Sequence, residues 1–555
     1  LDQVLRYHRR TKHSFTDYAR GPRGLDWANQ PDPFRRYSPA PLVHLLHPSA
    51  ADGDGDCCYP TPSYSSLFDS LPAPKPISRS TISELFHNSL ALSAWKTSGF
   101  STWSLRVNPS SGNLHPTEAY IVSPAVDGLS EHAFVAHYAP EEHALEVRAR
   151  IPTDFFPECF PDGSFLVGFS SIFWREAWKY GERAFRYCNH DVGHAIASVS
   201  MAAAALGWTV RILDGLGHED LGKLMGLQPP VRSFSMPTKP VKGKMPEIEF
   251  EHPDCALLVF PGDSGDFEVD YDRLRSKFSH LDWIGKANAL SEEHICWDII
   301  YRTAEAVQKP PTTSKKESII INDNPPSNAI DDPSSLGLTL SQVARKRRSA
   351  VDMDGSTSIS RETFYRIMLH CLPSNKFGAL TWACNLHAVV FVHRVAGLPA
   401  GLYFLVRNAA HFPELKSSMR SDFKWAVPDG CPDDLPLFEL SRGDCRDLSK
   451  RLSCHQDIAG DGCFSLGMVA RFEPTLRDVG AWMYPRLFWE SGVLGQILYL
   501  EAHEVGVSAT GIGCFFDDPV HEVMGVKGWA YQSLYHFTVG GAVVDTRITS
   551  LPAYP

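Results

Sequence analysis

AYIVSPAVDGL, residues 119–129, decides the fold because its pattern returns later in the chain. AVVFVHRVAGL, residues 388–398, aligns with it without a gap, and both segments begin with an apolar run that favours a strand. A second pair of segments, 207–227 and 506–526, aligns in the same way, with glycines and a methionine in register. A spaced repeat of roughly 200 residues indicates a duplicated domain rather than a solenoid.

The periodic segments around these copies predict helices as well as strands. Residues 191–207 and 490–506 have the apolar pattern of long buried helices, and further strands are expected at 401–406 and 534–540. Thr81 and Glu84 have capping-box spacing, so a helix is expected to begin there. Helices and strands in both halves predict an α+β protein.

A segment between the two halves has a different composition. Residues 309–337 are rich in Pro, Ser, Asn and Asp, which is typical of an exposed linker. The sequence therefore predicts an N-terminal domain over 1–308, a linker over 309–337 and a C-terminal domain over 338–555.

The composition excludes several classes of protein. Of the 555 residues, 43% are hydrophobic and 21% are charged, and the net charge of −11 argues against a general nucleic-acid surface. No run of about 18 apolar residues occurs, so no membrane span is expected. The 13 cysteines are scattered without a CxxC pair, which argues against a disulfide framework and a cysteine-rich zinc site. We expect a soluble intracellular protein of the cytoplasm or of an organelle matrix such as a plastid.

The two copies differ where a ligand site would lie. PSSGN, residues 109–113, precedes the strand of the first copy, whereas the second copy has GALTW at 378–382. Conversely, the second copy has the glycine-rich GIG at 511–513, where the first has ILD at 212–214. Two equivalent sites across a dimer interface would thus have become one complete site and one degenerate site.

A further motif opens each half and completes a resemblance. RYHRRTKHSF, residues 6–15, and RKRRSAVDMD, residues 345–354, both carry Arg-Arg followed by a hydroxyl residue. With PSSGN and GIG, in this order, the chain resembles the nitroreductase family, and most closely its tandem SagB/ThcOx-type dehydrogenases, over nearly its whole length except 309–335. The resemblance implies two nitroreductase-like domains, each an antiparallel or mixed sheet flanked by helices, that form an intramolecular pseudo-dimer and bind FMN at the interface.

The resemblance also assigns the cofactor site. Arg347 and Ser349, supported by Arg345 or Arg348 and by the late Arg547, suit the FMN phosphate, which favours arginine forks and a hydroxyl. Val351 stands where the family often has another arginine. The remaining cofactor-binding residues that the resemblance implies are Pro109, Ser110, Ser111, Asn113, Gly511, Ile512 and Gly513. The alternatives are a plain turn or cap at PSSGN, a solvated helix face at the arginines and a simple connection at the glycines.

Three further groups of residues are candidates for catalysis or metal binding. Lys179 and Tyr180 resemble the Lys-Tyr pair of azoline oxidases in this family, in which the pair is implied to handle the proton; the alternative is a Lys179 ion pair and a packed Tyr180. His190 and His194 have metal-ligand spacing on a helix, but no third ligand is evident and no metal site is predicted. Cys514 has no matched base in the sequence and is interpreted as a buried cysteine.

These expectations combine into one predicted function. The chain is expected to be an FMN-dependent oxidoreductase, a dehydrogenase or oxidase, that acts on a small organic substrate by hydride transfer at the flavin. The alternatives are a reductase of nitro compounds or quinones with NAD(P)H as electron donor, and a non-catalytic flavin-binding protein. No nucleic-acid partner is expected, and the chain could act as a monomer because its dimer is fused.

Overall fold

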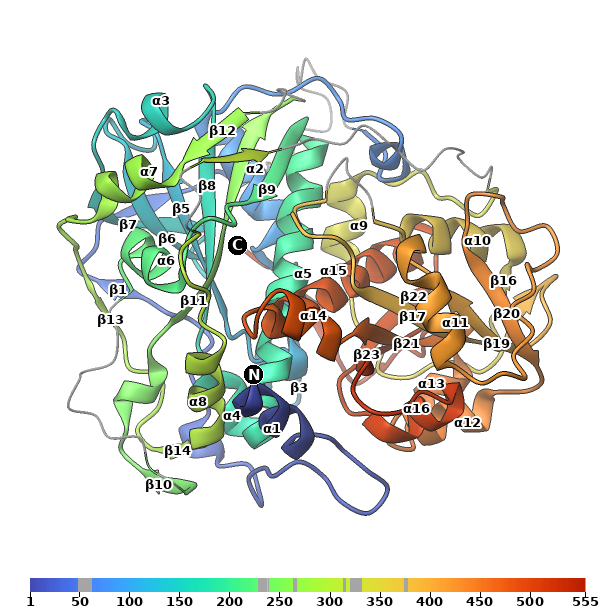
Figure 1. Cartoon of the computed structure of the whole chain (residues 1–555). Coiled ribbons are helices and arrows are strands. Elements are labelled where there is room, and N and C mark those ends of the chain that lie inside the picture. Colours follow the sequence, from blue (N-terminus) through green and yellow to red (C-terminus); the bar gives the residue numbers. More distant parts are fainter. Residues whose placement is uncertain are drawn as a thin grey trace.

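Two antiparallel sheets lie side by side in the computed structural model, which describes residues 1–47, 62–227, 237, 239–262, 267–312, 316–319, 332–373 and 378–554 (Figure 1). The first sheet has the order β2 (Leu42–His44), β7 (Ala144–Arg150), β6 (Phe134–Ala139), β5 (Thr117–Ser123), β8 (Phe165–Ser171), β11 (His252–Pro261) and β9 (Trp208–Ile212). The second has the order β20 (Leu437–Arg442), β19 (Gly401–Leu405), β17 (Leu386–Val392), β21 (Phe464–Arg471), β23 (Tyr531–Gly540) and β22 (Ser508–Ile512).

Six strands of the first sheet, β7 to β9 in its order, correspond to the six strands of the second sheet, and β2 has no counterpart among the described strands. The aligned segments at 119–129 and 388–398 begin in β5 and β17, and each of these strands pairs with two antiparallel neighbours. The other aligned segments form a strand and a helix in each half, α6 (His218–Met225) after β9 and α16 (Asp517–Met524) after β22. Both helices end at a glycine with a left-handed backbone, Gly226 at φ 68° and Gly525 at φ 79°, which is a common helix C-cap.

Two long helices cross between the sheets (Figure 1). α5 (Ala184–Ala205) and α15 (Met483–Glu504) contain the predicted buried helices, and nearly all their residues are buried. At the crossing, a Cβ on Gly193 would lie 2.3 Å from the Trp489 carbonyl oxygen, and one on Gly492 would lie 2.2 Å from the His190 carbonyl oxygen. Glycine is therefore required on both helices, and one continuous hydrophobic core joins the two halves.

Shorter helices cover the sheets and the crossing. They are α1 (Asp2–Arg10), α2 (Arg79–Ser89), α3 (Phe155–Cys159), α4 (Phe173–Tyr180), α7 (Tyr271–Phe278), α8 (Asp298–Ala306), α9 (Leu340–Lys346), α10 (Arg361–His370), α11 (Phe412–Ser418), α12 (Arg446–Leu452), α13 (Ile458–Asp461) and α14 (Glu473–Asp478). The predicted start of α2 was wrong, because Ser78 is the N-cap and exchanges capping hydrogen bonds with Thr81. Glu84 instead pairs with Lys75 at 3.1 Å.

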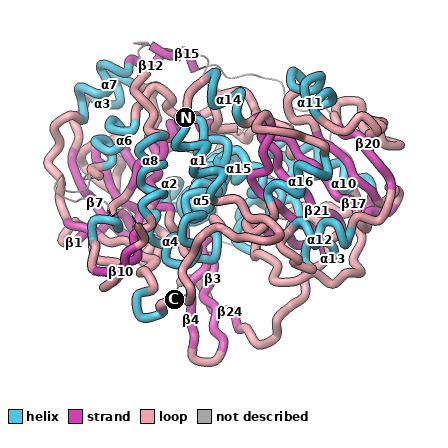
Figure 2. The backbone as a smooth tube through the Cα atoms, turned by 60° about the horizontal axis from the view of Figure 1, so that its bottom comes forward, coloured by secondary structure: helices cyan, strands magenta, loops and turns pink. Residues whose placement is uncertain are grey.

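The halves also exchange a strand. β24 (Thr549–Leu551), near the end of the chain, pairs with β3 (Leu92–Ser98) of the first half, which pairs with β4 (Ser101–Arg106), as Figure 2 shows below the helices. Four two-stranded pairs complete the fold: β1 (Tyr37–Ser38) with β13 (Lys286–Ala287), β10 (Val241–Gly243) with β14 (His294–Cys296), β12 (Phe267–Asp270) with β15 (Lys316–Ile319), and β16 (Ile359–Ser360) with β18 (Val395–Ala396).

Part of the predicted linker is therefore a strand, since β15 lies within 309–337. Residues 313–315 and 320–331 of that segment lie outside the described residues. The α+β pseudo-dimer predicted from the sequence is confirmed. Over the described residues, no helix is both long and apolar enough to span a membrane.

Candidate functional site

A cavity of about 840 Å³ lies where the two halves meet. The first half lines it with the loop before β5, the end of α4 and residues of α5, and the second half with the segment after α9, the end of β22 and residues near the C-terminus. Ten of the predicted cofactor-binding residues line this cavity: Pro109, Ser110, Ser111, Asn113, Arg347, Arg348, Ser349, Gly511, Ile512 and Gly513. Segments about 400 residues apart in the sequence thus share one site.

Hydrogen bonds to Asp191 of α5 stabilise the loop from Pro109 to Asn113. The hydroxyl of Ser110 donates to the Asp191 carboxylate at 2.7 Å, and the backbone N–H and hydroxyl of Ser111 both donate to it at 3.0 Å. The Asn113 amide donates to the Ser104 carbonyl oxygen at 2.9 Å. The two serine hydroxyls expected to donate to a ligand therefore serve to shape the loop in this structure.

Two buried carboxyl groups lie behind this loop. Burial raises the pKa of Asp191 to about 7, although the donors from Ser110 and Ser111 act in the opposite direction. Glu176 of α4 is fully buried, and in the described part of the chain neither of its oxygens has a hydrogen-bond partner. Burial, with the charge of Asp191, raises the pKa of Glu176 well above its usual range. This pair therefore retains a proton more readily than exposed carboxylates do.

Tyr180 ends α4 and covers the loop. A Cβ on Gly112 would lie 2.5 Å from the Tyr180 hydroxyl oxygen, and Gly112 has a left-handed backbone with a φ of 59°. Both the contact and the backbone conformation favour glycine at this position. Tyr180 lines the cavity, whereas Lys179 does not: its ammonium nitrogen lies 5.3 Å from the centroid of the Tyr180 ring. Of the predicted catalytic pair, only Tyr180 reaches the cavity.

The glycine-rich segment 511–513 is not a turn, because Gly511 and Ile512 end β22 and pair with β23, and it faces aromatic side chains. A Cβ on Gly511 would lie 2.0 Å from the Tyr535 hydroxyl oxygen, and one on Gly513 would lie 2.5 Å from the ring of Tyr187. Because Tyr187 comes from α5, this segment of the second half packs against the first half. In this structure, the space that glycine leaves at both positions is occupied by tyrosines of the chain itself.

The arginines on the other side of the cavity have no counter-charge. Arg347 is buried and donates to the carbonyl oxygens of Val107 at 3.1 Å and Arg106 at 3.2 Å. Arg348 donates to the carbonyl oxygens of Arg345 and Arg347, and Ser349 shares a hydrogen bond of 2.8 Å with the Tyr499 hydroxyl. Across the described residues, neither Arg347 nor Arg348, nor the neighbouring Arg345, forms an ion pair with a carboxylate.

The pKa values of these arginines reflect that excess of positive charge. Burial lowers the pKa of Arg347, and burial together with the charges of Arg347 and Arg345 lowers the pKa of Arg348 to about 10. Lys96 also lines the cavity, and burial and Arg348 lower its pKa. Burying several positive charges next to one another costs free energy, so this part of the cavity suits a bound anion.

Two of the arginines predicted to bind the phosphate, Arg345 and Arg547, lie outside the cavity. Arg345 donates to the His87 carbonyl oxygen at 2.8 Å and to the Leu92 carbonyl oxygen at 3.2 Å, and it does not line the cavity. Arg547 is 84% exposed and pairs at 2.8 Å with Asp545, which does line the cavity. Arg347 and Arg348 are thus the predicted arginines that reach the cavity.

The equivalent region of the pseudo-dimer is filled by the chain itself. The Ile212 N–H donates to the Ala379 carbonyl oxygen at 3.0 Å, and the Trp382 indole donates to Glu490 at 2.7 Å. Arg486 pairs with Asp214 at 2.6 Å. Among the described residues, which exclude 374–377 just before GALTW, the cavities found there have volumes of about 60 and 120 Å³, too small for a second copy of the site.

The first copy of the Arg-Arg motif also lies away from both regions. Arg10 forms an ion pair with Glu182, and the Arg9 guanidinium lies 5.3 Å from the Trp529 ring centroid. Arg9, Arg10 and Thr11 therefore line neither of the small cavities in the region around GALTW and ILD.

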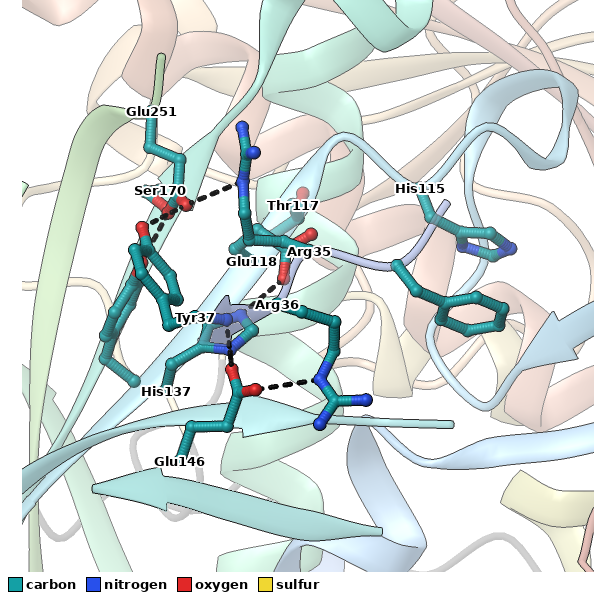
Figure 3. Close-up of polar contacts among 12 residues, drawn as sticks. Arg35, Arg36, Tyr37, His115, Thr117, Glu118, His137, Glu146, Ser170 and Glu251 are labelled. Atoms are coloured by element: carbon teal, nitrogen blue, oxygen red, sulfur yellow. Dashed lines mark hydrogen bonds and ion pairs between the residues drawn. The ribbon is translucent and has the colours of Figure 1, made fainter. Parts of the chain in front are cut away.

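Figure 3 shows a buried polar network on the first sheet that includes Glu118 and His137, and Glu118 also connects this network to α4. Glu118 of β5 pairs with Arg175 of α4, and Arg175 also donates to the His115 carbonyl oxygen at 2.8 Å. His137 lies between Glu118 and Glu146, at 2.8 and 2.9 Å. Burial alone would lower the pKa of His137, but the hydrogen bonds to the two glutamates outweigh it and raise that pKa. These contacts fix α4, and therefore Tyr180, against the loop.

Sequence reasoning missed Asp191 and the tyrosines that line the site, which are Tyr187, Tyr499 and Tyr535. One signal for Asp191 was present in the repeat. With Gly207 aligned on Gly506, Asp191 falls on Glu490, so both copies have an acid at this position, and each acid accepts hydrogen bonds from its own pre-strand loop. The tyrosines had no such signal.

Comparisons with known proteins give a family-model match over part of the chain and a fold. Residues 73–236 match the nitroreductase family model. Over 98% of this chain and 99% of the other, the structure resembles a candidate nitroreductase from Anabaena variabilis with a TM-score of 0.67 at 18% sequence identity, which establishes the shared fold. No curated protein matches the sequence.

Smaller structures match part of the chain only. An E. coli microcin synthetase complex covers 39% of this chain and 73% of its own at 18% identity, with a TM-score of 0.25. A candidate nitroreductase in complex with FMN from Exiguobacterium sibiricum covers 37% and 88% at 14% identity, with a TM-score of 0.22. TM-scores this low support no inference about this chain.

Proposed function

We propose, from the membership of residues 73–236 in the nitroreductase family, that the chain is an FMN-dependent oxidoreductase with one complete site, the cavity between its halves. The observation that carries this proposal is the arginine cluster. Arg347 and Arg348 face a cavity without a carboxylate partner among the described residues, and the loop that the sequence associates with flavin lies across the same cavity.

The residues present fit FMN. A phosphate group with nearly two negative charges favours guanidinium forks and a hydroxyl, which Arg347, Arg348 and Ser349 provide. The cavity volume of about 840 Å³ is within the range of roughly 300–1,000 Å³ that is typical of small-molecule and cofactor sites. Pro109 to Asn113 on one side and Gly511 to Gly513 on the other would flank the flavin ring. The cofactor, when bound, supplies hydride transfer.

The chain's own contribution is orientation and proton handling. In the part of the chain that the structure describes, the Tyr180 hydroxyl makes no hydrogen bond, and Tyr180 lines the cavity, so this group can meet a substrate. Lys179 acts as a positioning residue whose charge lies 5.3 Å from the Tyr180 ring. Because burial raises the pKa of Tyr180, its hydroxyl suits hydrogen bonding or proton donation to a small organic substrate, and Lys179 can influence the substrate only through Tyr180. We favour a dehydrogenase or oxidase because this pair resembles the Lys-Tyr pair of azoline oxidases.

Binding of FMN tests the site. Titration of the flavin-free protein with FMN should give an affinity that Arg347→Ala lowers by about tenfold to a hundredfold, since hydrogen bonds to charged groups contribute roughly 1.5–3 kcal/mol. Arg9→Ala is the matched control, because Arg9 belongs to the other copy of the motif, is exposed and does not line the cavity. Equal losses in the two variants would contradict the assignment.

Flavin reduction tests the chemistry in the same preparations. A panel of small organic compounds, and NAD(P)H separately, would be screened for loss of flavin absorbance. Lys179→Ala should keep bound FMN and lose substrate-driven reduction by about 10²–10⁴-fold, the usual contribution of acid–base catalysis, while reduction by NAD(P)H is kept. Unchanged reduction by the substrate would instead favour an NAD(P)H-dependent reductase.

A further inference from the structure

A pair of cysteines lies at the edge of the same cavity. Cys514 follows the glycine-rich segment directly and lines the cavity, and its sulfur lies 2.8 Å from that of Cys454. Cys454 comes just after α12 and has a φ of 54°, a left-handed backbone that non-glycine residues rarely adopt. Such backbone strain persists where the surrounding structure enforces it, and here it brings the second thiol to the first.

A histidine from the opposite half completes the arrangement. His13 accepts a hydrogen bond from the Ala19 N–H at Nδ1, at 3.0 Å, so its Nε2 carries the proton on the side of Cys514. Arg183, also of the first half, donates to the Gly513 carbonyl oxygen at 3.1 Å. A hydrogen-bond donor that stabilises a Cys514 thiolate, which no sequence pattern revealed, is thus supplied from about 500 residues away.

The two thiols are unequal. The hydrogen bond between the two thiols, with further contributions from His13 and Arg183, lowers the pKa of Cys514 against the effect of burial. The same hydrogen bond, reinforced by burial, raises the pKa of Cys454. Of the eleven cysteines that the structure describes, Cys514 alone has a lowered pKa; burial raises the pKa of the cysteines other than Cys454 and Cys514 by more than any neighbouring positive charge lowers it.

We propose that Cys454 and Cys514 form a redox-active dithiol in the wall of the cavity that exchanges with small-molecule disulfides. The Cys514 thiolate attacks one sulfur of the disulfide, whose S–S bond breaks and releases one thiolate. Cys454 then loses its proton and attacks the Cys514 sulfur, which expels the second thiolate. Two protein thiols are oxidised to one disulfide while the small disulfide is reduced to two thiols.

This site is independent of the proposed flavin function, since the exchange needs only the chain and a disulfide. It also differs from a buried cysteine without chemistry, because the thiolate character, the resolving thiol and the access from the cavity occur together. Its disulfide form would join the residues after α12 to the segment after β22.

Peptide mapping of the full chain tests the proposal. The protein, with and without added FMN, is incubated with oxidised glutathione, alkylated and digested. We expect a disulfide-linked peptide pair of Cys454 and Cys514. In Cys454→Ser, glutathione should remain attached to Cys514, since the resolving thiol is gone. Cys431→Ser is the control, because Cys431 is half-buried and has no thiol neighbour in the described structure, and this variant should form the disulfide as the wild type does.

Alkylation rates provide the second measurement. Iodoacetamide should modify Cys514 at least about tenfold faster than Cys431, and His13→Gln should reduce that difference. Recovery of Cys454 and Cys514 as separately alkylated peptides after glutathione treatment would overturn the proposal. So would a Cys514 alkylation rate no greater than that of Cys431.

Discussion

Gly112 is the residue at which the loop of the first half meets Tyr180. Its φ of 59°, and the 2.5 Å that would separate an added Cβ from the Tyr180 hydroxyl oxygen, make it sensitive to substitution for two separate reasons. Gly99, in the turn between β3 and β4, has the same φ of 59° but no atom within 4 Å of the position of a Cβ. The two glycines therefore separate backbone strain from contact with Tyr180.

Gly112→Ala should lower FMN affinity by about tenfold or more, because Tyr180 must move and a change of about 1.4 kcal/mol already gives that factor. Gly99→Ala should carry a similar backbone strain of about 1–2 kcal/mol with unchanged FMN affinity. FMN titration and urea denaturation of both variants check this. Unchanged affinity in Gly112→Ala would show that Tyr180 has no role in shaping the site.

At the residue scale, sequence reasoning identified groups whose type is distinctive and missed those defined by their neighbours. Ser110, Arg347 and Gly511 belong to short motifs that the sequence displays directly. By contrast, the pairing of His13 with Cys514 depends on contact between opposite ends of the chain. The orientation of Arg345 toward the carbonyl oxygens of His87 and Leu92, away from the cavity, likewise depends on packing that no spacing predicts.

At the scale of elements, the crossing of α5 and α15 holds the two halves of the site together. Both helices were predicted from their apolar pattern, but their close approach at Gly193 and Gly492 was not, because helical glycines occur for several reasons. The crossing places Asp191 beneath the loop and Tyr187 beside Gly513. A change at the crossing should therefore affect both stability and the site.

Gly492→Ala should destabilise the fold by about 1–3 kcal/mol, the usual cost of overpacking, because the added Cβ would lie 2.2 Å from the His190 carbonyl oxygen. Gly222→Ala is the control on α6, where the nearest atom lies 3.9 Å away, and it should be neutral or stabilising by up to about 1 kcal/mol. Urea denaturation measures both. A Gly492→Ala variant as stable as the wild type would contradict the claim that the close approach of α5 and α15 requires glycine at this position.

At the scale of the whole molecule, a buried ion cluster fastens the second half to the first. Asp517, at the start of α16, pairs with Arg183 at 3.0 Å and with Arg186 at 2.6 Å, and accepts from the His13 N–H at 3.0 Å. Burial favours the neutral carboxyl group, but the two arginines outweigh it and hold the pKa of Asp517 well below its ordinary range. Its ionised form therefore stabilises the folded state.

Asp517→Asn should cost about 3–5 kcal/mol at neutral pH, because two buried guanidinium groups lose their partner. Since the folded pKa is depressed, this contribution is present above the unfolded pKa of about 4 and is lost as the pH falls toward the folded value. The stability difference between wild type and variant should therefore shrink as urea denaturation is repeated from about pH 7 to about pH 3.

Asp518→Asn is the matched control. Asp518 also pairs with the first half, through Lys12 at 2.5 Å, but its side chain is 58% exposed, so the cost should be at most about 1 kcal/mol. A difference between wild type and Asp517→Asn that stays constant over the whole pH range would contradict the role given to its charge.

The duplication and its asymmetry were visible in the sequence, because the aligned strands and helices keep their pattern while PSSGN and GIG each survive in one copy. The sequence did not reveal what fills the other region. Trp382, Arg486 and Asp214 close it through contacts between segments that are distant in the chain. The exchange of β24 onto β3 is equally a product of tertiary structure.

The most direct measurement is the amount of FMN bound per chain. The protein is saturated with FMN, freed of excess ligand and denatured, and the released flavin is compared with the protein concentration. One cavity of about 840 Å³ and two remnants of about 60 and 120 Å³ predict a ratio close to one. A ratio close to two would contradict the single composite site, because it would require the region around Trp382 to bind flavin as well.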